Sequence, residues 1–332
     1  MKPVRWGILS TAKIGWEKVV PAMMKSPHCE IVAVASRNEE SAKSMAADLG
    51  IPRTYGSYDD LLAAPDIEAV YNPLPNHLHV PLTLAAAQAG KHVLCEKPMA
   101  LDADEARQLE AAASQVMIAE AFMIRHHPQW LRAQDLVRQG EIGEVRAVNV
   151  LFSYFNVDPA NIRNRSDIGG GALLDIGCYA VVSGRLLFEA DPVRVTALID
   201  RDPDFGTDRL SSGLVDFGAG RHLVFTVSTQ LVPYQRVQVM GTKGRLEIQI
   251  PFNAPPGETT RIFVDDGAQL GDRSARMLEV PPCDQYELQG AAFSRAIRGE
   301  APLIGGVEDA VLNMRILDAL RRSEASGRWE NP

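Results

Sequence analysis

An acid and a base follow directly after a short apolar run in the first third of this 332-residue chain. The run Val93-Leu94-Cys95 is long enough for a buried strand and too short for an ordinary helix, and it leads into Glu96-Lys97-Pro98. Ligands of open α/β sheets bind outside the carboxyl ends of the strands. A lysine there can reach a bound substrate, and the glutamate can hold that lysine. For an isolated Glu-Lys-Pro, the start of a solvated loop is the better interpretation, so the rest of the chain must decide.

A second pair of reactive groups lies in a stretch predicted as a helix over residues 172–189. If this stretch is α-helical, Asp175 and Tyr179 are four residues apart and share one face. Their apolar neighbours would bury them in part, so both need polar partners, and Lys97 is a candidate. A lysine beside a phenol lowers the pKa of the phenol, which suits Tyr179 to general acid–base work. The alternative is that Asp175 only lies near the start of a helix and Tyr179 only packs in the core. Taken by itself, this stretch favours that alternative.

The loop over residues 10–15 separates a predicted strand from a predicted helix. A dinucleotide fingerprint would read Gly-x-Gly-x-x-Gly there, and Ser10 and Ala12 replace its first two glycines. Both residues are small, so the backbone can still approach a pyrophosphate at the helix N-terminus. A plain tight turn is the alternative. The residues predicted to bind the cofactor in this loop are Ser10, Thr11, Ala12, Lys13 and Ile14.

The second predicted strand ends at Ser36-Arg37, where an NAD site usually has an acid for the ribose 2′-hydroxyl. An arginine instead attracts the 2′-phosphate of NADP, often through a two-pronged contact. These residues therefore favour NADP over NAD. The alternative is that Arg37 only pairs with Glu39 or Glu40.

The third predicted strand leads into a loop that contains two prolines and two asparagines, over residues 71–79. This loop is expected at the same sheet edge, where it could wall the nicotinamide side of a cofactor. A rigid turn without function is equally compatible with these residues. The predicted cofactor-binding residues at this edge are Pro73, Leu74, Asn76, His79, Glu96 and Lys97.

Strand-like and helix-like segments alternate through the first third of the chain, which indicates a doubly wound parallel sheet. The predicted strands there are residues 4–9, 31–35, 67–71, 93–95 and 116–120, and the helices include 39–49, 80–89 and 102–114. After a long strand over residues 143–155, short strands separated by turn signals predict a mostly antiparallel sheet. We therefore expect an α/β Rossmann domain over residues 1–123 and an α+β domain over residues 124–332. The final helices, 287–299 and 307–325, could pack back on the first domain.

The composition excludes several classes of partner. A formal net charge of −8 and the absence of a long basic run argue against nucleic acid or an anionic membrane surface. The four cysteines lie far apart, so we expect reduced packing residues of a cytoplasmic protein. The histidines lack further correctly spaced ligands, so no metal site is predicted.

Taken together, these motifs resemble those of the Gfo/Idh/MocA oxidoreductase family over nearly the whole chain. The marks that carry the resemblance are Cys95-Glu96-Lys97-Pro98, Pro75-Asn76-His77-Leu78-His79, Glu120-Ala121-Phe122-Met123 with Arg125 and His127-Pro128, and the stretch from Gly169 to Tyr179. The resemblance implies an N-terminal Rossmann domain and a C-terminal domain with an open sheet that commonly forms a dimer interface. It also implies hydride transfer between a nicotinamide cofactor and a sugar, polyol or related alcohol.

The resemblance further implies roles for single residues. The family's catalytic lysine falls on Lys97 and its acid on Asp175, while Tyr179 stands where many members have a histidine. The tyrosine and the Ser36-Arg37 pair resemble the subgroup of NADP-dependent D-xylose 1-dehydrogenases and trans-dihydrodiol dehydrogenases. Arg163 is a further candidate for substrate binding. The alternatives are a ketone or anhydro-sugar reductase of the same family and a sensor that binds NAD(P) without turnover.

Overall fold

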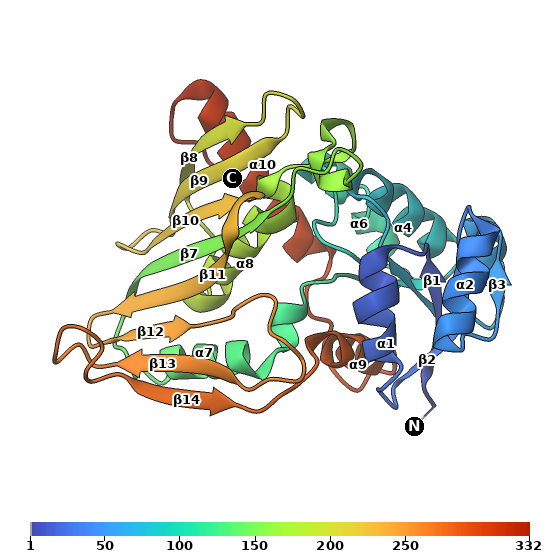
Figure 1. The fold of residues 1–332 in the computed structure, drawn as a ribbon, viewed down its shortest axis with the longest axis horizontal. Coiled ribbons are helices and arrows are strands. Elements are labelled where there is room, and N and C mark those ends of the chain that lie inside the picture. Colours follow the sequence, from blue (N-terminus) through green and yellow to red (C-terminus); the bar gives the residue numbers. More distant parts are fainter. Residues whose placement is uncertain (1) are drawn as a thin grey trace. The chain divides into compact units, whose positions relative to one another are not determined.

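The computed structural model describes residues 2–332, which fall into two compact units. Unit 1 takes in the described residues up to His126 together with Asp284–Val311, and unit 2 consists of His127–Cys283 and Leu312–Pro332. The chain therefore leaves unit 1, passes through unit 2, and returns to unit 1 before its final helix (Figure 1).

Unit 1 is built on a six-stranded sheet, sheet A, in which all neighbouring strands are parallel. Its strand order is β3 (Thr54–Tyr55), β2 (Cys29–Ala35), β1 (Val4–Leu9), β4 (Ala69–Asn72), β5 (His92–Cys95) and β6 (Ile118–Glu120). This order is that of a doubly wound dinucleotide-binding sheet. The predicted parallel sheet is confirmed, and the carboxyl ends of its strands meet at one edge.

Short helices connect the strands of sheet A. They are a π-helical turn over Gly15–Val19 that continues into α1 (Val20–Met23), α2 (Glu39–Leu49), α3 (Tyr58–Leu62), α4 (His79–Gln88), α5 (Ala103–Arg107) and α6 (Glu110–Ala113). From the later part of the chain, unit 1 adds α9 (Gln285–Ile297) and the start of α10 (Val307–Ser326). Trp6 of β1 is fully buried, its ring lies tilted against that of Phe293 of α9 with centroids 5.7 Å apart, and it donates its indole N–H to Ser294. Helix α9 therefore completes the core of unit 1.

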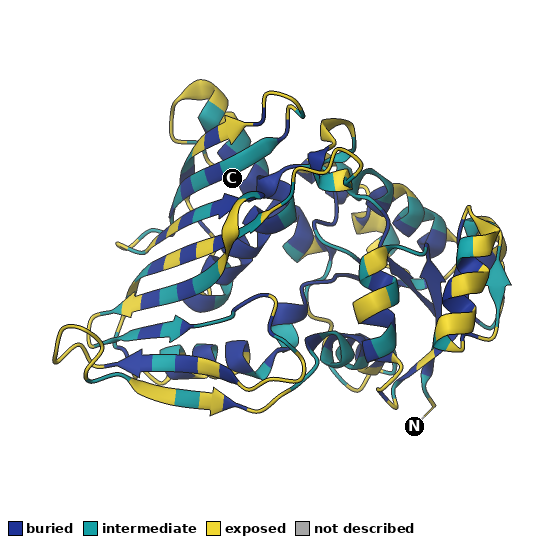
Figure 2. Ribbon diagram, in the orientation of Figure 1, coloured by how far each residue is buried: buried dark blue, intermediate teal, exposed yellow. Residues whose placement is uncertain are grey.

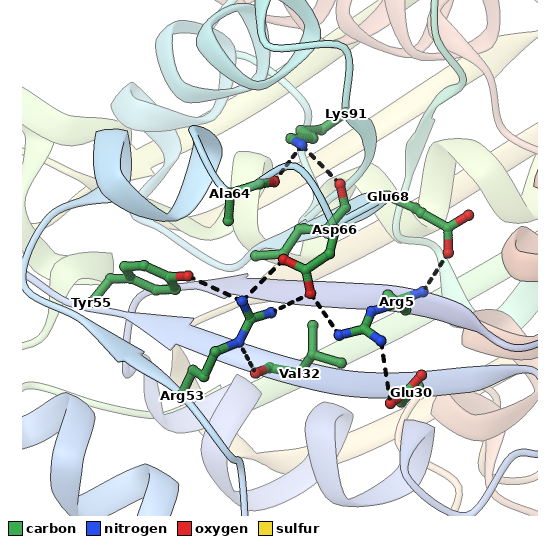
Figure 3. Close-up of polar contacts among 10 residues, drawn as sticks. Arg5, Glu30, Val32, Arg53, Tyr55, Ala64, Asp66, Glu68 and Lys91 are labelled. Atoms are coloured by element: carbon green, nitrogen blue, oxygen red, sulfur yellow. Dashed lines mark hydrogen bonds and ion pairs between the residues drawn. The ribbon is translucent and has the colours of Figure 1, made fainter.

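The amino end of sheet A is tied together by charge (Figure 3). The Asp66 carboxylate accepts hydrogen bonds from Arg5 at 2.6 Å and from Arg53 at 2.7 and 3.0 Å. The buried ammonium group of Lys91 reaches main-chain carbonyls of the segment that precedes β4. These contacts fix the end of the sheet that lies opposite the predicted ligand edge.

Unit 2 is built on an eight-stranded sheet, sheet B, that is antiparallel except where β7 pairs with β10. Its order is β14 (Arg276–Val280), β13 (Thr260–Asp265), β12 (Arg245–Ile248), β11 (Gln230–Gly241), β7 (Val145–Phe155), β10 (His222–Ser228), β9 (Asp208–Asp216) and β8 (Arg194–Arg201). The predicted, mostly antiparallel second sheet is confirmed. Helices α7 (Pro128–Arg138) and α8 (Cys178–Phe188) contact this sheet.

One face of sheet B is open. In β7, Val148, Val150 and Phe152 are buried, whereas Leu151, which lies between them in sequence, is 47% exposed. Such alternation is typical of a sheet packed on one side only, and Figure 2 shows buried and exposed bands alternating along these strands.

Two predicted helices differ from the structure. Residues 102–114 form two short helices, because the N–H groups of Gln108 and Leu109 bond to carbonyls three residues back in place of four. The stretch 172–189 begins with a π-helical turn over Leu173–Gly177 before α8. A π-turn advances fewer degrees per residue than an α-helix, so the one-face argument for Asp175 and Tyr179, which assumed α-helical spacing, does not apply as stated.

Candidate functional site

The carboxyl edge of sheet A carries every residue predicted to bind the cofactor. Strands β1, β2, β4 and β5 end at Leu9, Ala35, Asn72 and Cys95, and the predicted segments follow these ends directly. Because the strands are parallel, these segments gather at one edge of unit 1. The fold therefore provides the place that a dinucleotide requires.

Ser10 opens the first of these segments in an unusual backbone conformation, with φ at 97°. Its N–H donates to Ala35 at 2.8 Å, and its hydroxyl accepts the N–H of Ala12 at 3.0 Å. A Cβ added at Gly15 would lie 3.5 Å from Tyr71 and Pro73, an ordinary van der Waals contact, so the helix starts close to the end of β4. The segment makes the turn of a dinucleotide loop without its first two glycines, which fits a bound pyrophosphate.

Arg37 lies exposed just beyond the end of β2. Burial raises the pKa of the Tyr58 hydroxyl, and the hydrogen bond and charge of Arg37 oppose that shift. Glu39 and Glu40 instead form ion pairs with Lys43 at 3.0 and 3.1 Å. The two acids considered as alternative partners of Arg37 are thus engaged elsewhere, which favours a phosphate as its ligand.

The segment that carries Lys97 is anchored by neighbouring strands. The N–H of Glu96 donates to Asn72 of β4 at 3.0 Å, and the peptide between Lys97 and Pro98 is cis. The fully buried Tyr71 donates its hydroxyl to the Glu96 carboxylate at 2.7 Å. Burial, followed by the charge of Glu96, raises the pKa of Tyr71 well above its usual value, so this phenol stays a donor.

The acid at the end of β6 holds the other side of the same segment. Glu120 is buried and accepts the N–H of Met99 at 2.8 Å. Tyr71 and Glu120 are therefore supports of the Lys97 segment that the sequence interpretation did not assign. The motif Glu120-Ala121-Phe122-Met123, which supports the family resemblance, was a signal for Glu120. No motif in the sequence pointed to Tyr71.

The predicted cofactor-binding residues in the loop after β4 differ in how far they are buried. Leu74 and His79 are buried, whereas Asn76 lies in a 3₁₀ turn over Asn76–Leu78 and is partly accessible. Both ring nitrogens of His79 face main-chain carbonyls. His79 thus contacts protein backbone on both sides of its ring.

In unit 2, the carboxylate of Asp175 binds two side chains. The Tyr154 hydroxyl donates to Asp175 at 2.6 Å, and Nε of Arg163 donates to the same oxygen at 2.9 Å. The charge of Asp175 raises the pKa of Arg163, and burial raises the pKa of Tyr154, so both remain protonated donors. The structure brings together the predicted Arg163 and Asp175. The sequence interpretation missed Tyr154, although it placed this residue at the end of a predicted strand.

Two glycines allow this arrangement. Gly171 has φ at 116°, and a Cβ on it would lie 1.9 Å from a carboxylate oxygen of Asp208. A Cβ on Gly170 would lie 2.5 Å from the carbonyl of Arg163. The N–H of Gly171 donates to that same carbonyl at 2.9 Å. The glycines therefore let the loop fold tightly enough to set Arg163 beside Asp175.

Tyr179 belongs to an aromatic cluster in unit 2. Its ring lies 5.8 Å from that of Phe152 and 5.2 Å from that of Phe252, and the residue is 5% exposed. This packing fixes the ring plane and so the place of the hydroxyl. Lys97 belongs to unit 1, whereas Asp175, Tyr179 and Arg163 belong to unit 2.

No group of three or more His, Cys, Asp or Glu side chains is arranged to hold a metal ion in residues 2–332. Over the same range, no helix is both long and apolar enough to cross a membrane.

Comparison with known proteins defines the class. Residues 4–119 match the oxidoreductase family with an NAD-binding Rossmann fold, and residues 130–247 match the GFO/IDH/MocA C-terminal domain. The class is thus that of two-part nicotinamide oxidoreductases.

Individual relatives agree over almost the full length. An uncharacterised oxidoreductase of Rhizobium meliloti is 47% identical over 99% of both chains. A D-xylose 1-dehydrogenase (NADP(+)) of Haloferax volcanii is 40% identical over 97% of this chain and 98% of its own. Among solved structures, a 3-ketoreductase from Actinomadura kijaniata in complex with NADP and TDP-benzene has a TM-score of 0.90 at 31% identity, covering 97% of this chain and 98% of its own.

The chain therefore belongs to the Gfo/Idh/MocA oxidoreductase family. The predicted family, two-part fold and oxidoreductase class are confirmed, and the NADP named for these relatives agrees with the predicted cofactor.

Proposed function

We propose that this chain is an NADP-dependent dehydrogenase that acts on a sugar or polyol hydroxyl, with D-xylose 1-dehydrogenation as the activity it most resembles. The observation that carries the proposal is the 40% identity, over nearly the full length, to a D-xylose 1-dehydrogenase that uses NADP. Arg37 at the end of β2 supports the same cofactor, because its two acidic neighbours pair with Lys43. The proposal places the enzyme in the cytoplasm, where cysteines such as the buried Cys29 stay reduced.

The cofactor would be held by the carboxyl edge of sheet A. The pyrophosphate would bind the loop of Ser10, Thr11, Ala12, Lys13 and Ile14, and the 2′-phosphate would bind Ser36 and Arg37. Pro73, Leu74 and Asn76, with Glu96 and Lys97, would line the nicotinamide. When bound, the nicotinamide ring supplies the acceptor for a hydride from the carbon that bears the substrate hydroxyl.

The chain's own residues handle the proton and the charge. Tyr179, as phenolate, accepts the proton of the substrate hydroxyl directly or through one water. The Lys97 ammonium group stabilises the negative charge that grows on that oxygen as the proton leaves. Asp175 and Arg163 bind the remaining hydroxyls of the substrate, and their ion pair at 2.9 Å supports a fixed geometry. The carbon thereby becomes a carbonyl, which gives a lactone when the substrate is an aldose oxidised at its first carbon.

The first experiment tests turnover directly. The purified chain is mixed with NADP⁺ or NAD⁺ and D-xylose, D-glucose, inositols or aromatic dihydrodiols, and the absorbance of the reduced cofactor is followed. We expect turnover with NADP⁺ and at least one sugar. A chain that binds NADPH yet turns over none of these substrates in either direction would be a sensor, contrary to the proposal.

The second experiment tests the proton carrier. Tyr179→Phe should lower kcat by about 10²–10⁴-fold, the usual range for general acid–base catalysis. Lys97→Ala should also abolish most turnover. Two variants serve as controls: Tyr234→Phe changes an accessible residue of β11, and Lys243→Ala changes an accessible residue of the turn between β11 and β12. Wild-type turnover by Tyr179→Phe would refute the assignment.

A reductase acting on a keto-sugar is the second candidate, and the close likeness to a 3-ketoreductase favours it. The residues would have the same roles in reverse, with Tyr179 giving the proton to the carbonyl oxygen. Faster consumption of NADPH with a keto-sugar than of NADP⁺ with any sugar of the panel would select this candidate.

A further inference from the structure

His79 is buried between two segments at the carboxyl edge of sheet A. It is 1% exposed and is the first residue of α4. Its Nδ1 lies 2.7 Å from the carbonyl oxygen of Pro98, and its Nε2 lies 2.6 Å from the carbonyl oxygen of Leu74. One ring thus touches both the segment that carries Lys97 and the loop that follows β4.

His79 is itself held in place. The fully buried Asn72 donates from its amide to the His79 carbonyl at 3.1 Å and to the Thr83 hydroxyl at 3.3 Å. The main-chain carbonyl of Asn72 also accepts the N–H of Glu96 at 3.0 Å. A rigid frame therefore runs from the end of β4, through the start of α4, to the segment around Lys97.

We propose that His79 is a positioning residue for Lys97. The Nδ1–H of His79 donates to the Pro98 carbonyl and thereby fixes the turn that carries the lysine. The proposal rests on the proposed function of Lys97. Glu120 anchors the same turn one residue later, through the N–H of Met99 at 2.8 Å. The main chain after Lys97 is thus held by two buried side chains from different elements.

The ring does this as a neutral group. Burial lowers the pKa of His79 to about 4, and the charges of Lys97 and His77 act in the same direction. A neutral imidazole carries one proton, so it donates to only one of its two carbonyls at a time. The proposal places this one proton on Nδ1, toward the Pro98 carbonyl at 2.7 Å.

Replacing His79 by asparagine or by glutamine distinguishes its contact to Pro98 from its contact to Leu74. Asparagine keeps a donor near the place of Nδ1, whereas glutamine keeps one near the place of Nε2. Because a misplacement of about 1 Å can cost about 100-fold in rate, we expect His79→Gln to lower kcat by about 10–100-fold. His79→Asn should recover most of that loss and stay within about fivefold of wild type.

Further measurements separate positioning from general damage. If His79 acts through Lys97, His79→Gln should lower kcat much less in the Lys97→Ala background than in wild type. The pH dependence of kcat above about pH 5 should keep its shape in both His79 variants, because burial lowers the pKa of His79 to about 4. Fluorescence titration with NADPH should show a smaller change in Kd than in kcat for His79→Gln.

His92→Asn is the matched control. His92 is a half-buried histidine at the other end of β5, and its Nδ1 accepts the N–H of Met117 at 2.9 Å. We expect a lowered Tm with little change in kcat. Equal losses of kcat in His79→Asn and His79→Gln would overturn the proposal. So would a loss of kcat from His79→Gln that is as large in the Lys97→Ala background as in wild type.

One measurement needs neither a variant nor turnover. Nitrogen-resolved NMR of the ¹⁵N-histidine-labelled wild-type chain reports which ring nitrogen of His79 is protonated. The proposal requires the proton on Nδ1, and a proton on Nε2 refutes it even if the variants do not fold. Absence of wild-type turnover would instead count against the proposed function, so the two failures are distinguishable.

Discussion

At the scale of single residues, Arg37 is the proposed determinant of the choice between the two nicotinamide cofactors. Arg37→Ala removes a charge-assisted contact to the 2′-phosphate, typically worth about 1.5–3 kcal/mol, which corresponds to roughly 10–100-fold in Kd. We expect this increase in Kd for NADPH and no comparable change for NADH. Fluorescence titration of both cofactors measures it, with Arg132→Ala, an exposed arginine of α7, as the control. Equal weakening of both cofactors would contradict the role of Arg37.

The same scale shows where sequence patterns stop. Lys97 and Asp175 could be selected because family motifs surround them. Tyr154 and Tyr71 could not, because each reaches its carboxylate across a distance of at least 21 positions along the chain. Such pairs are set by the meeting of separate elements, which the residue types alone do not reveal.

At the scale of elements, the glycine loop before α8 controls how Asp175 is presented. Gly171→Ala would force a side chain into a positive φ and against the Asp208 carboxylate. We expect a loss of about 1–3 kcal/mol in the free energy of unfolding, the usual cost of such strain, together with a lower kcat. Urea unfolding and the turnover assay measure the two effects. At Gly257, an added Cβ meets no atom within 4 Å, so Gly257→Ala should leave both nearly unchanged.

The amino end of sheet A offers a second test at this scale. The ammonium group of Lys91 donates to the carbonyls of Ala64 and Ile67, both at 2.8 Å, and Lys91 is 6% exposed (Figure 3). Lys91→Met keeps most of the stem and leaves both carbonyls without this donor. We expect a loss of about 2–3 kcal/mol in the free energy of unfolding. Lys18→Met, at an exposed position, is the control, and equal stability of the two variants would show that water replaces the ammonium group.

Elements with a strong repeating pattern were predictable from the sequence. The predicted strand 4–9 and the predicted helix 39–49 match β1 and α2 residue for residue. The two-residue β3 and the mostly exposed edge strand β14 carry too little pattern, and neither was predicted. The π-turn before α8 was also beyond prediction, because its residues keep a helical composition while their hydrogen bonding changes.

At the scale of the whole molecule, the open face of sheet B is the surface that we expect a second copy to cover. Leu151 of β7, Val224 of β10 and Leu198 of β8 lie exposed on this sheet, and an open face of this kind suits a self-complementary interface. Leu151→Asp should shift a dimer or tetramer toward monomer in sedimentation velocity. Leu270→Asp changes a fully accessible loop leucine and should leave the assembly intact. A wild-type chain that sediments as a monomer at micromolar concentration would exclude this interface.

The return of residues 284–311 to unit 1 sets an order of events during synthesis. Trp6 emerges from the ribosome early, yet its aromatic contact Phe293 and its hydrogen-bond partner Ser294 are made almost three hundred residues later. Until then, the apolar surface that α9 covers has no native cover, although all six strands of sheet A have been synthesised. Unit 2 faces no such long wait, since 157 consecutive residues, His127–Cys283, supply most of it. The nascent chain is therefore expected to assemble most of its second unit before α9 completes the core of its first, and the final segment, Leu312–Pro332, joins unit 2 last.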